Sequence, residues 1–141
     1  MAEITVTSNL IRPLEGAIVR RYDAGGALSA GDWVYVNSDG EVEQADADAE
    51  AASQARGLVV ADSTGATSFA AGPRVDVVVY GPVTGFSGMT PGDAIFVSVT
   101  PGKGDHTAPA AAGDYPFACG YAESDVTVFV SPQAQEPVVN T

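Results

Sequence analysis

The 141-residue chain has one cysteine, Cys119, and one histidine, His106. A single cysteine excludes an intrachain disulfide and a multi-cysteine zinc site, and one histidine beside it supplies too few soft ligands for zinc. A nucleophilic Cys119–His106 pair is conceivable, but no family signature surrounds Cys119, and its strand-like surroundings are typical of a small core residue. The sequence therefore favours a protein that is not an enzyme and that holds no cofactor or metal.

Basic residues are also scarce, because six Lys and Arg face eighteen Asp and Glu, for a net charge of −12. This balance argues against binding to nucleic acid or to an anionic membrane, both of which need clustered positive charge. No stretch approaches the roughly 20 apolar residues of a membrane span, and the first residues do not predict a signal peptide. The charge is uneven: residues 1–21 carry +1, whereas residues 22–141 carry −13.

The longest acidic segment, Glu41–Glu50, is a candidate calcium loop. Asp46, Asp48 and Glu50 match the first three ligand positions of an EF-hand. The positions that should be Gly and Glu are Ala51 and Gly57, so the motif fails. A solvated acidic loop is the better interpretation. The eighteen acids also offer carboxylate pairs for glycoside hydrolysis, but no spacing singles one out.

Sixteen glycines and nine prolines separate short apolar runs rich in β-branched and aromatic residues. Such runs with regular turn signals predict an all-β fold, a small compact β-barrel or sandwich of short strands. Asp46–Ala55 is Ala-rich without an apolar stripe, so at most one or two helical turns are expected there. Core packing is expected for most aromatic side chains, with Phe86 and Tyr115 as loop-borne exceptions. The predicted strands are Gly16–Arg21, Asp32–Asn37, Glu41–Gln44, Gly57–Ala61, Arg74–Tyr80, Ala94–Val99, Phe117–Ala122 and Asp125–Ser131.

Three segments are expected along the chain: an extended arm over residues 1–13, a β-rich domain over residues 14–132 and a flexible tail over residues 133–141. The residue before Pro13 is restricted to extended conformations, and the arm has apolar side chains with little reason to fold alone. Such a segment commonly adds to the sheet edge of a partner. The predicted contact residues of the arm are Ile4, Val6, Leu10, Ile11 and Arg12.

The chain contains an internal similarity between residues 28–36 and 89–97, where an apolar residue precedes Gly-Asp and a strand. Gly31 and Gly92 are expected to form turns, and Asp32 and Asp93 to accept hydrogen bonds from turn amides. Gly-containing strands follow in each copy, at offsets of 61 and 63 residues. The pattern suggests a pseudo-duplicated β-domain, with chance as the competing explanation because Gly-Asp turns are common.

The order of these motifs resembles the capsid cement, or head decoration, proteins of tailed bacteriophages. The resemblance covers roughly residues 14–131 and implies a non-enzymatic β-rich domain, commonly trimeric. Such a domain binds the outside of an expanded phage head at three-fold and quasi-three-fold positions, where it clamps major capsid subunits. The motifs that carry it are Gly16-Ala-Ile-Val, Leu28-x-Ala-Gly-Asp-x-Val, Gly57-Leu-Val-Val-Ala, Gly72-Pro-Arg-Val-Asp-Val-Val-Val-Tyr-Gly81, Met89-x-Pro-Gly-Asp-Ala-Ile-Phe-Val, Phe117-Ala-Cys-Gly-Tyr-Ala and Val126-Thr-Val-Phe-Val.

The resemblance thus implies the major capsid protein and further copies of this chain as partners, and the virion exterior as the location after assembly in the bacterial cytoplasm. Two other classes stay open. One is a β-module of a phage tail, fibre or surface assembly that binds glycan or a host receptor. The other is a small hydrolase or lyase, which would place His106 or a carboxylate pair in a concave pocket.

Overall fold

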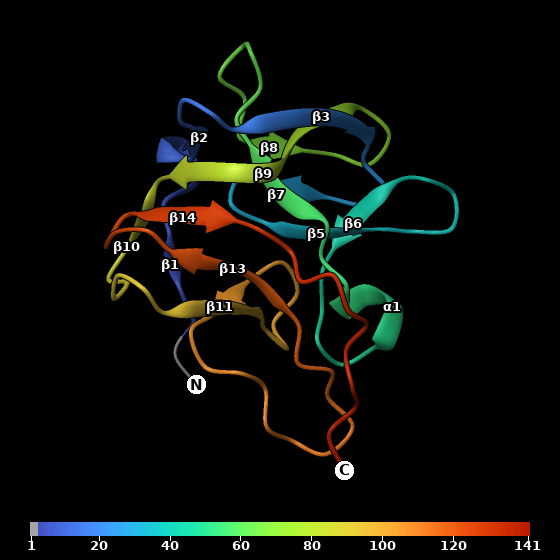
Figure 1. Ribbon diagram of the computed structural model, residues 1–141. Helices are drawn as coiled ribbons and strands as arrows, with labels where there is room; N and C mark the ends of the chain where they lie inside the picture. The colour runs from blue at the N-terminus through green and yellow to red at the C-terminus, as the bar shows by residue number, and fades with distance from the viewer. Residues whose placement is uncertain (1–2) are drawn as a thin grey trace.

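The computed structural model describes residues 3–141 and is nearly all β, with 40% strand and 5% helix, which confirms the expected fold class (Figure 1). All eight predicted strands are present, and the single turn of α1 (Glu50–Ser53) lies within the segment expected to hold at most two helical turns. The main strands are β2 (Arg12–Pro13), β3 (Ile18–Asp23), β5 (Trp33–Val36), β6 (Val42–Gln44), β7 (Gly57–Val60), β9 (Arg74–Thr84), β11 (Ala94–Val97), β12 (Gly104–Asp105), β13 (Ala118–Ala122) and β14 (Thr127–Val130).

These strands form one antiparallel sheet in the order β12-β11-β13-β14-β9-β7-β5-β6, which curls into a half-barrel. The strands β2 and β3 lie off this path, and both pair with β9. Two small ladders complete the fold, together with one short 3₁₀ helix, η1 (Ser8–Leu10): β1 (Thr5–Val6) pairs with β10 (Phe86–Ser87), and β4 (Leu28–Ser29) pairs with β8 (Ser68–Phe69).

The longest strand, β9, differs from its prediction because it continues through Gly81-Pro82, where the turn signal predicted an end. Its first part pairs with β3 and β7, and its last part pairs with β2 and β14. Gly81 has φ +116°, and a Cβ there would lie 2.7 Å from the Cα of Ala17. Only glycine fits this approach and this backbone conformation, so Gly81 marks the point where one strand changes partners.

The two Gly-Asp units adopt the same turn. Gly31 and Gly92 both have positive φ, at +99° and +92°. In the first unit the Asp32 N–H donates to the Ser29 carbonyl at 3.0 Å, and in the second the Asp93 N–H donates to the Thr90 carbonyl at 3.1 Å. The expectation that these glycines form turns is therefore confirmed.

Strand pairing extends this correspondence beyond the turns. Trp33 of β5 lies opposite Leu58 of β7, and Ala94 of β11 lies opposite Tyr121 of β13. These pairs are related by the same offsets of 61 and 63 residues that the sequence shows. In the sheet order, β12-β11-β13-β14 therefore mirrors β6-β5-β7-β9, so the structure supports a pseudo-duplicated domain.

Two apolar clusters form the interior. The larger contains Trp33, Phe117 and Leu58, together with residues from both ends of the sheet. The smaller contains Leu28 and Phe69, which lie in the β4–β8 ladder, packed on valines of β5, β7 and β9.

The described part of the predicted arm, residues 3–13, belongs to the domain and is not a free extension. The backbone N–H of Ile4 donates to the Gly104 carbonyl at 2.8 Å, and β1 pairs with β10. Ile4 and Ile11 are buried in the larger cluster, and Val6 packs against it. The expectation that Ile4 and Ile11 contact a partner is corrected, because both side chains are buried in the core of their own domain. Met1 and Ala2 lie outside the described residues.

The predicted flexible tail is also held by the domain. Asn140 exchanges backbone hydrogen bonds with Gly113 and Asp114, and its side-chain Nδ2 donates to the Pro109 carbonyl at 2.8 Å. Pro137 is buried. The tail is thus ordered by contacts that sequence spacing does not reveal.

Neighbouring residues of the N-terminal segment provide a direct test of this placement. Ile11 is 1% exposed and Leu10 is 50% exposed. We expect Ile11→Ala to lower the free energy of unfolding by about 2–5 kcal/mol, because it leaves a cavity. Leu10→Ala should change it by less than about 0.5 kcal/mol. Urea denaturation measures both, and equal effects would contradict the burial of this segment in the core.

Gly81→Ala should destabilise the protein more than Gly88→Ala. Both glycines have positive φ, so each substitution costs roughly 1–2 kcal/mol of backbone strain. A Cβ at Gly88 meets nothing within 4 Å, whereas one at Gly81 meets backbone. The difference in stability between the two variants, measured by thermal denaturation, gives the cost of the steric clash at Gly81. A larger loss of stability in Gly88→Ala would contradict the role of Gly81.

Candidate interaction surfaces

An apolar ladder crosses the sheet at the centre of the molecule. The ring of Tyr80 meets that of Phe129 edge-on at 5.1 Å, and Tyr121 stacks on Phe129 at 5.3 Å. Ile18 lies opposite Tyr80 on the neighbouring strand, and Pro82 lies opposite Phe129. We call these five residues the aromatic ladder.

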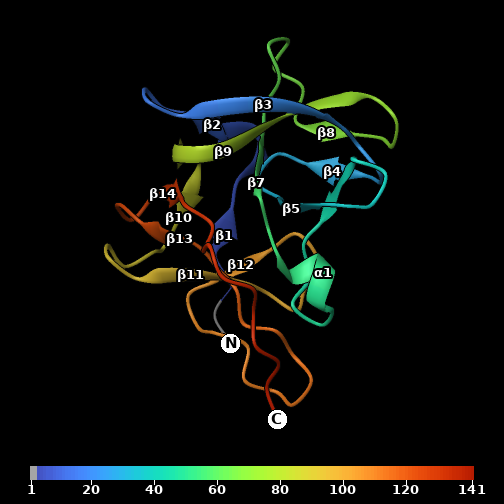
Figure 2. The same ribbon diagram turned by 45° about the vertical axis from the view of Figure 1, so that its right-hand side comes forward.

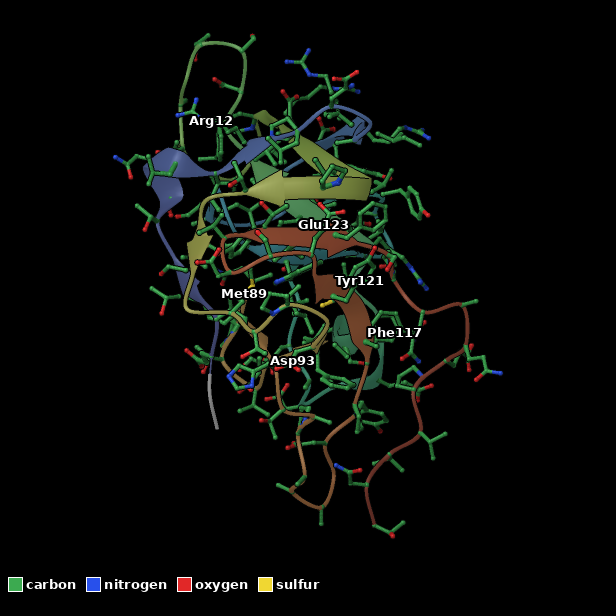
Figure 3. All side chains as sticks on the ribbon, turned by 60° about the vertical axis from the view of Figure 1, so that its left-hand side comes forward. Arg12, Met89, Asp93, Phe117, Tyr121 and Glu123 are labelled. Atoms are coloured by element: carbon green, nitrogen blue, oxygen red, sulfur yellow. The ribbon has the colours of Figure 1, made fainter. Side chains whose placement is uncertain are left out.

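The aromatic ladder is open to solvent. Ile18, Tyr80 and Tyr121 are 53%, 51% and 40% exposed, and Phe129 is half-buried between the two tyrosines. Tyr121 is labelled in Figure 3. The sequence predicted core packing for these aromatic residues, which is wrong for Tyr80 and Tyr121. The period-two pattern of Val126–Val130 contained a signal for Phe129, because it places Phe129 on the face opposite the buried Val128 and Val130. Apolar side chains that gather at the surface in this way make the aromatic ladder a candidate surface for contact with another molecule.

A second apolar hollow lies beside the N-terminal segment. Leu10, Arg12, Phe86 and Val126 line an open groove of about 330 Å³ next to Gly85. Leu10 and Arg12 are thus the two predicted arm residues that remain at the surface. Phe86, predicted as loop-borne, is instead buried in β10.

Asp32, the predicted turn residue, has a structural position. Its Oδ2 accepts from the Ser29 backbone N–H at 2.9 Å and from the Gln44 side-chain nitrogen at 3.0 Å, which confirms the expected bond to a turn amide. Burial raises the pKa of this carboxyl, while these hydrogen bonds and the charge of Lys103 oppose the rise. Asp93 repeats the backbone turn and is half-buried.

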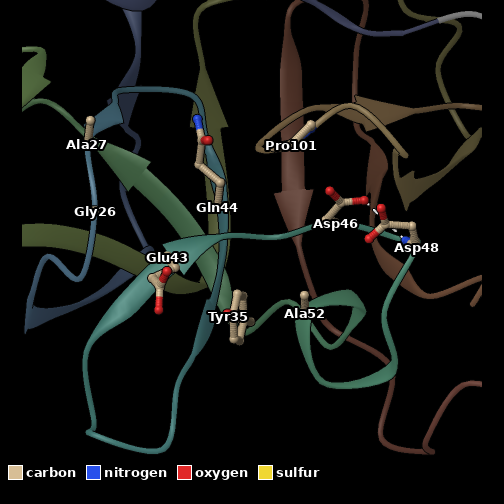
Figure 4. Close-up of a pocket in the computed structure, with 9 residues that line it drawn as sticks. All are labelled: Gly26, Ala27, Tyr35, Glu43, Gln44, Asp46, Asp48, Ala52 and Pro101. Atoms are coloured by element: carbon tan, nitrogen blue, oxygen red, sulfur yellow. Dashed lines mark hydrogen bonds between the residues drawn. The ribbon is translucent and has the colours of Figure 1, made fainter.

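The acidic segment borders an open hollow of about 410 Å³ (Figure 4). Two hydrogen bonds hold acidic side chains of this segment. The Asp48 backbone N–H donates to Oδ1 of Asp46 at 3.1 Å, and Nδ2 of Asn37 donates to the Glu43 carboxylate at 2.7 Å. Burial raises the pKa of Asp46, and the charges of Asp48 and Asp114 add to the rise. Within residues 3–141, no group of three or more acidic, histidine or cysteine side chains is arranged to hold a metal ion.

Cys119 and His106 occupy different environments. Cys119 is buried, its thiol donates to the Ile95 carbonyl at 3.4 Å, and burial raises the thiol pKa well above its usual value. His106 is exposed in the loop after β12. A raised pKa is the opposite of what an attacking thiolate needs.

No family model matches the chain, and no curated protein matches it. In the part of the chain that is described, no helix is long and apolar enough to cross a membrane.

The raised pKa of Asp46 predicts a specific dependence of stability on pH. Because the folded protein binds this proton more tightly than the unfolded chain does, stability from Asp46 is gained as pH falls through the raised pKa and is lost above it. Asp48→Asn removes a neighbouring charge but keeps the backbone N–H that Asp46 accepts. We expect a lower Asp46 pKa and a higher melting temperature at pH 7.

The control for this substitution is Asp39→Asn, which removes one charge from an exposed turn of the same acidic region. NMR titration of the Asp46 carboxyl and melting curves between pH 3 and pH 8 measure both effects. An unchanged Asp46 pKa in Asp48→Asn, or equal stabilisation by Asp39→Asn, would show that only net charge matters.

Proposed function

We propose that this chain is a structural cement protein, which binds the exterior of an expanded bacteriophage capsid and stabilises contacts between major capsid subunits. The observation that carries the proposal is the aromatic ladder, an exposed apolar surface on an otherwise acidic β-domain. Its position across four neighbouring strands, β3, β9, β14 and β13, gives a rigid contact surface, since side chains on a sheet lose little freedom when they bind. The resemblance to cement proteins supplies the partner.

The charge distribution supports this role. A net charge of −12 keeps many free copies soluble and apart until they meet the shell. Leu10 and Arg12, beside their apolar groove, add a second surface that can contact the capsid.

We also propose that the chain acts as a homotrimer at three-fold and quasi-three-fold positions of the capsid. Three copies bind through three equivalent contacts, so that weak single contacts sum to stable attachment. The virion exterior is then its location, after assembly in the bacterial cytoplasm.

The exposed tyrosines also favour the alternative, a module of a phage tail or fibre that binds glycan or a host receptor, because sugars stack on aromatic rings. In the aromatic ladder, however, Phe129 is packed against both tyrosines, so part of their ring surface is already used. The capsid proposal is therefore preferred.

Expanded capsids that lack this protein, assembled from the major capsid protein of the same genome, test the proposal. We expect saturable binding and a higher temperature of capsid disruption, measured by sedimentation and calorimetry. The double variant Tyr80→Ser/Tyr121→Ser should weaken binding by at least about tenfold, which corresponds to 1.4 kcal/mol.

The matched control is Val138→Ser, because Val138 is 80% exposed and lies outside the aromatic ladder. Absence of binding by the intact chain would overturn the cement function. Equal binding by the double variant and the control would overturn the role of the aromatic ladder. Binding to a glycan array but not to capsids would support the alternative.

A further inference from the structure

The strand β3 is an edge strand whose outer side is open. All six of its residues are exposed or half-exposed, and it pairs only with β9. It lies along the top of the molecule in both ribbon views (Figures 1 and 2). An edge strand presents a row of backbone donors and acceptors to any extended segment that approaches it.

The hydrogen-bond pattern identifies which backbone groups face outward. Val59 of β7 exchanges bonds with the Gly31–Asp32 turn, so its neighbours Leu58 and Val60 face β9. They pair with Val78 and Asp76, which therefore face β7. Because backbone groups alternate along a strand, Val75 and Val77 of β9 face β3 instead.

On β3, the residues opposite Val75 and Val77 are Tyr22 and Arg20. The alternation continues at Ala24, whose N–H donates to the Pro73 carbonyl at 3.0 Å. The backbone groups of Val19, Arg21 and Asp23 consequently point away from β9. Beside Asp23 the edge is already occupied, because Ala24 forms a parallel bridge with Val42 of β6. Val19 and Arg21 are therefore the outward positions of β3 that are open to a further strand.

The chain covers the terminal strands of the main sheet, in contrast to β3. Gly25 donates its N–H to the Val42 carbonyl of β6 at 2.8 Å, and Ile4 does the same to Gly104 of β12 at 2.8 Å. The longest uncovered edge of the sheet is thus β3.

The side chains of β3 indicate what would bind there. Ile18 and Val19 are exposed and apolar, and Arg20 forms no ion pair with a described residue. Arg21 is paired with Asp76 at 3.0 Å, and Asp23 with Arg74 at 3.4 Å. Four of the six basic residues of the chain lie on β2, β3 and β9.

A second copy of this chain is a poor occupant. Antiparallel pairing of two β3 strands about their centre would place Arg20 opposite Arg20, or Arg21 opposite Arg21, of the other copy. Like charges directly opposite each other destabilise a sheet. An acidic partner strand avoids this like-charge pair, because it places a carboxylate beside Arg20.

We propose that β3 is an acceptor for an acidic, extended segment of a partner protein, which adds to the sheet as a strand beside Val19 and Arg21. Apolar side chains of that segment lie against Ile18 and Val19, and an Asp or Glu pairs with Arg20. Strand addition takes its affinity from backbone hydrogen bonds and its selectivity from alternate side chains. The inference does not depend on the capsid proposal, because it rests on β3 alone.

Two capped eight-residue peptides test the proposal with the whole chain: one alternates valine with glutamate, the other valine with lysine. We expect the glutamate peptide to bind about tenfold more tightly by fluorescence anisotropy. Hydrogen exchange should show new protection at the amides of Val19 and Arg21. No binding, equal binding of the two peptides, or protection elsewhere would overturn it.

Two variants separate backbone from charge. Val19→Pro removes one outward N–H and is compatible with an edge position, so it should weaken binding of the glutamate peptide by about tenfold. Arg20→Glu should reverse the preference between the two peptides. Unchanged binding by a folded Val19→Pro would overturn strand addition. If Val19→Pro does not fold, the exposed Arg20→Glu decides alone, and an unreversed preference overturns the proposal.

Discussion

The fold depends on one strand, β9, that pairs with strands of both halves of the main sheet. Up to Tyr80, β9 pairs with β3 and β7, and from Gly81 onward it pairs with β2 and β14. Gly81, where β9 changes partners, has positive φ and no room for a Cβ. The backbone of Gly16 and Ala17, between β2 and β3, lies within contact distance of it. A side chain at Gly81 would push the segment between β2 and β3 away from β9.

The two halves of the sheet, β12-β11-β13-β14 and β6-β5-β7-β9, are built alike. In each half a glycine lets neighbouring strands approach closely. Gly57 in one unit and Gly120 in the other lie at corresponding register positions, and a Cβ at either would collide with the backbone of the next strand. Repeating one turn and one strand pair supplies most of the sheet from a simple pattern. The same construction leaves the aromatic ladder on the outer side, where the strands of the two halves meet.

The sequence predicts the long strands and the two turns, because period-two patterns and Gly-Asp signals are local. The two-residue strands, such as β10 and β12, exist only through pairing with distant segments and have no local signal. The N-terminal segment was misassigned for the same reason: Ile11 is buried because Gly85, far along the chain, lets the backbones approach. Exposure of Tyr80 follows from the shift in the β3–β9 register between Ile18 and Val19, which alternation alone does not predict.

The proposed capsid contact gives the aromatic ladder a purpose that folding does not, since exposed Tyr80 and Tyr121 contribute little to the core. The most direct measurement is a cryo-electron microscopy reconstruction of expanded capsids saturated with this protein. It should show β-rich density at the three-fold positions, with Tyr80, Phe129 and Tyr121 covered by a capsid subunit or a second copy. Capsids without that density, or an aromatic ladder that faces solvent in the bound protein, would contradict the central claim.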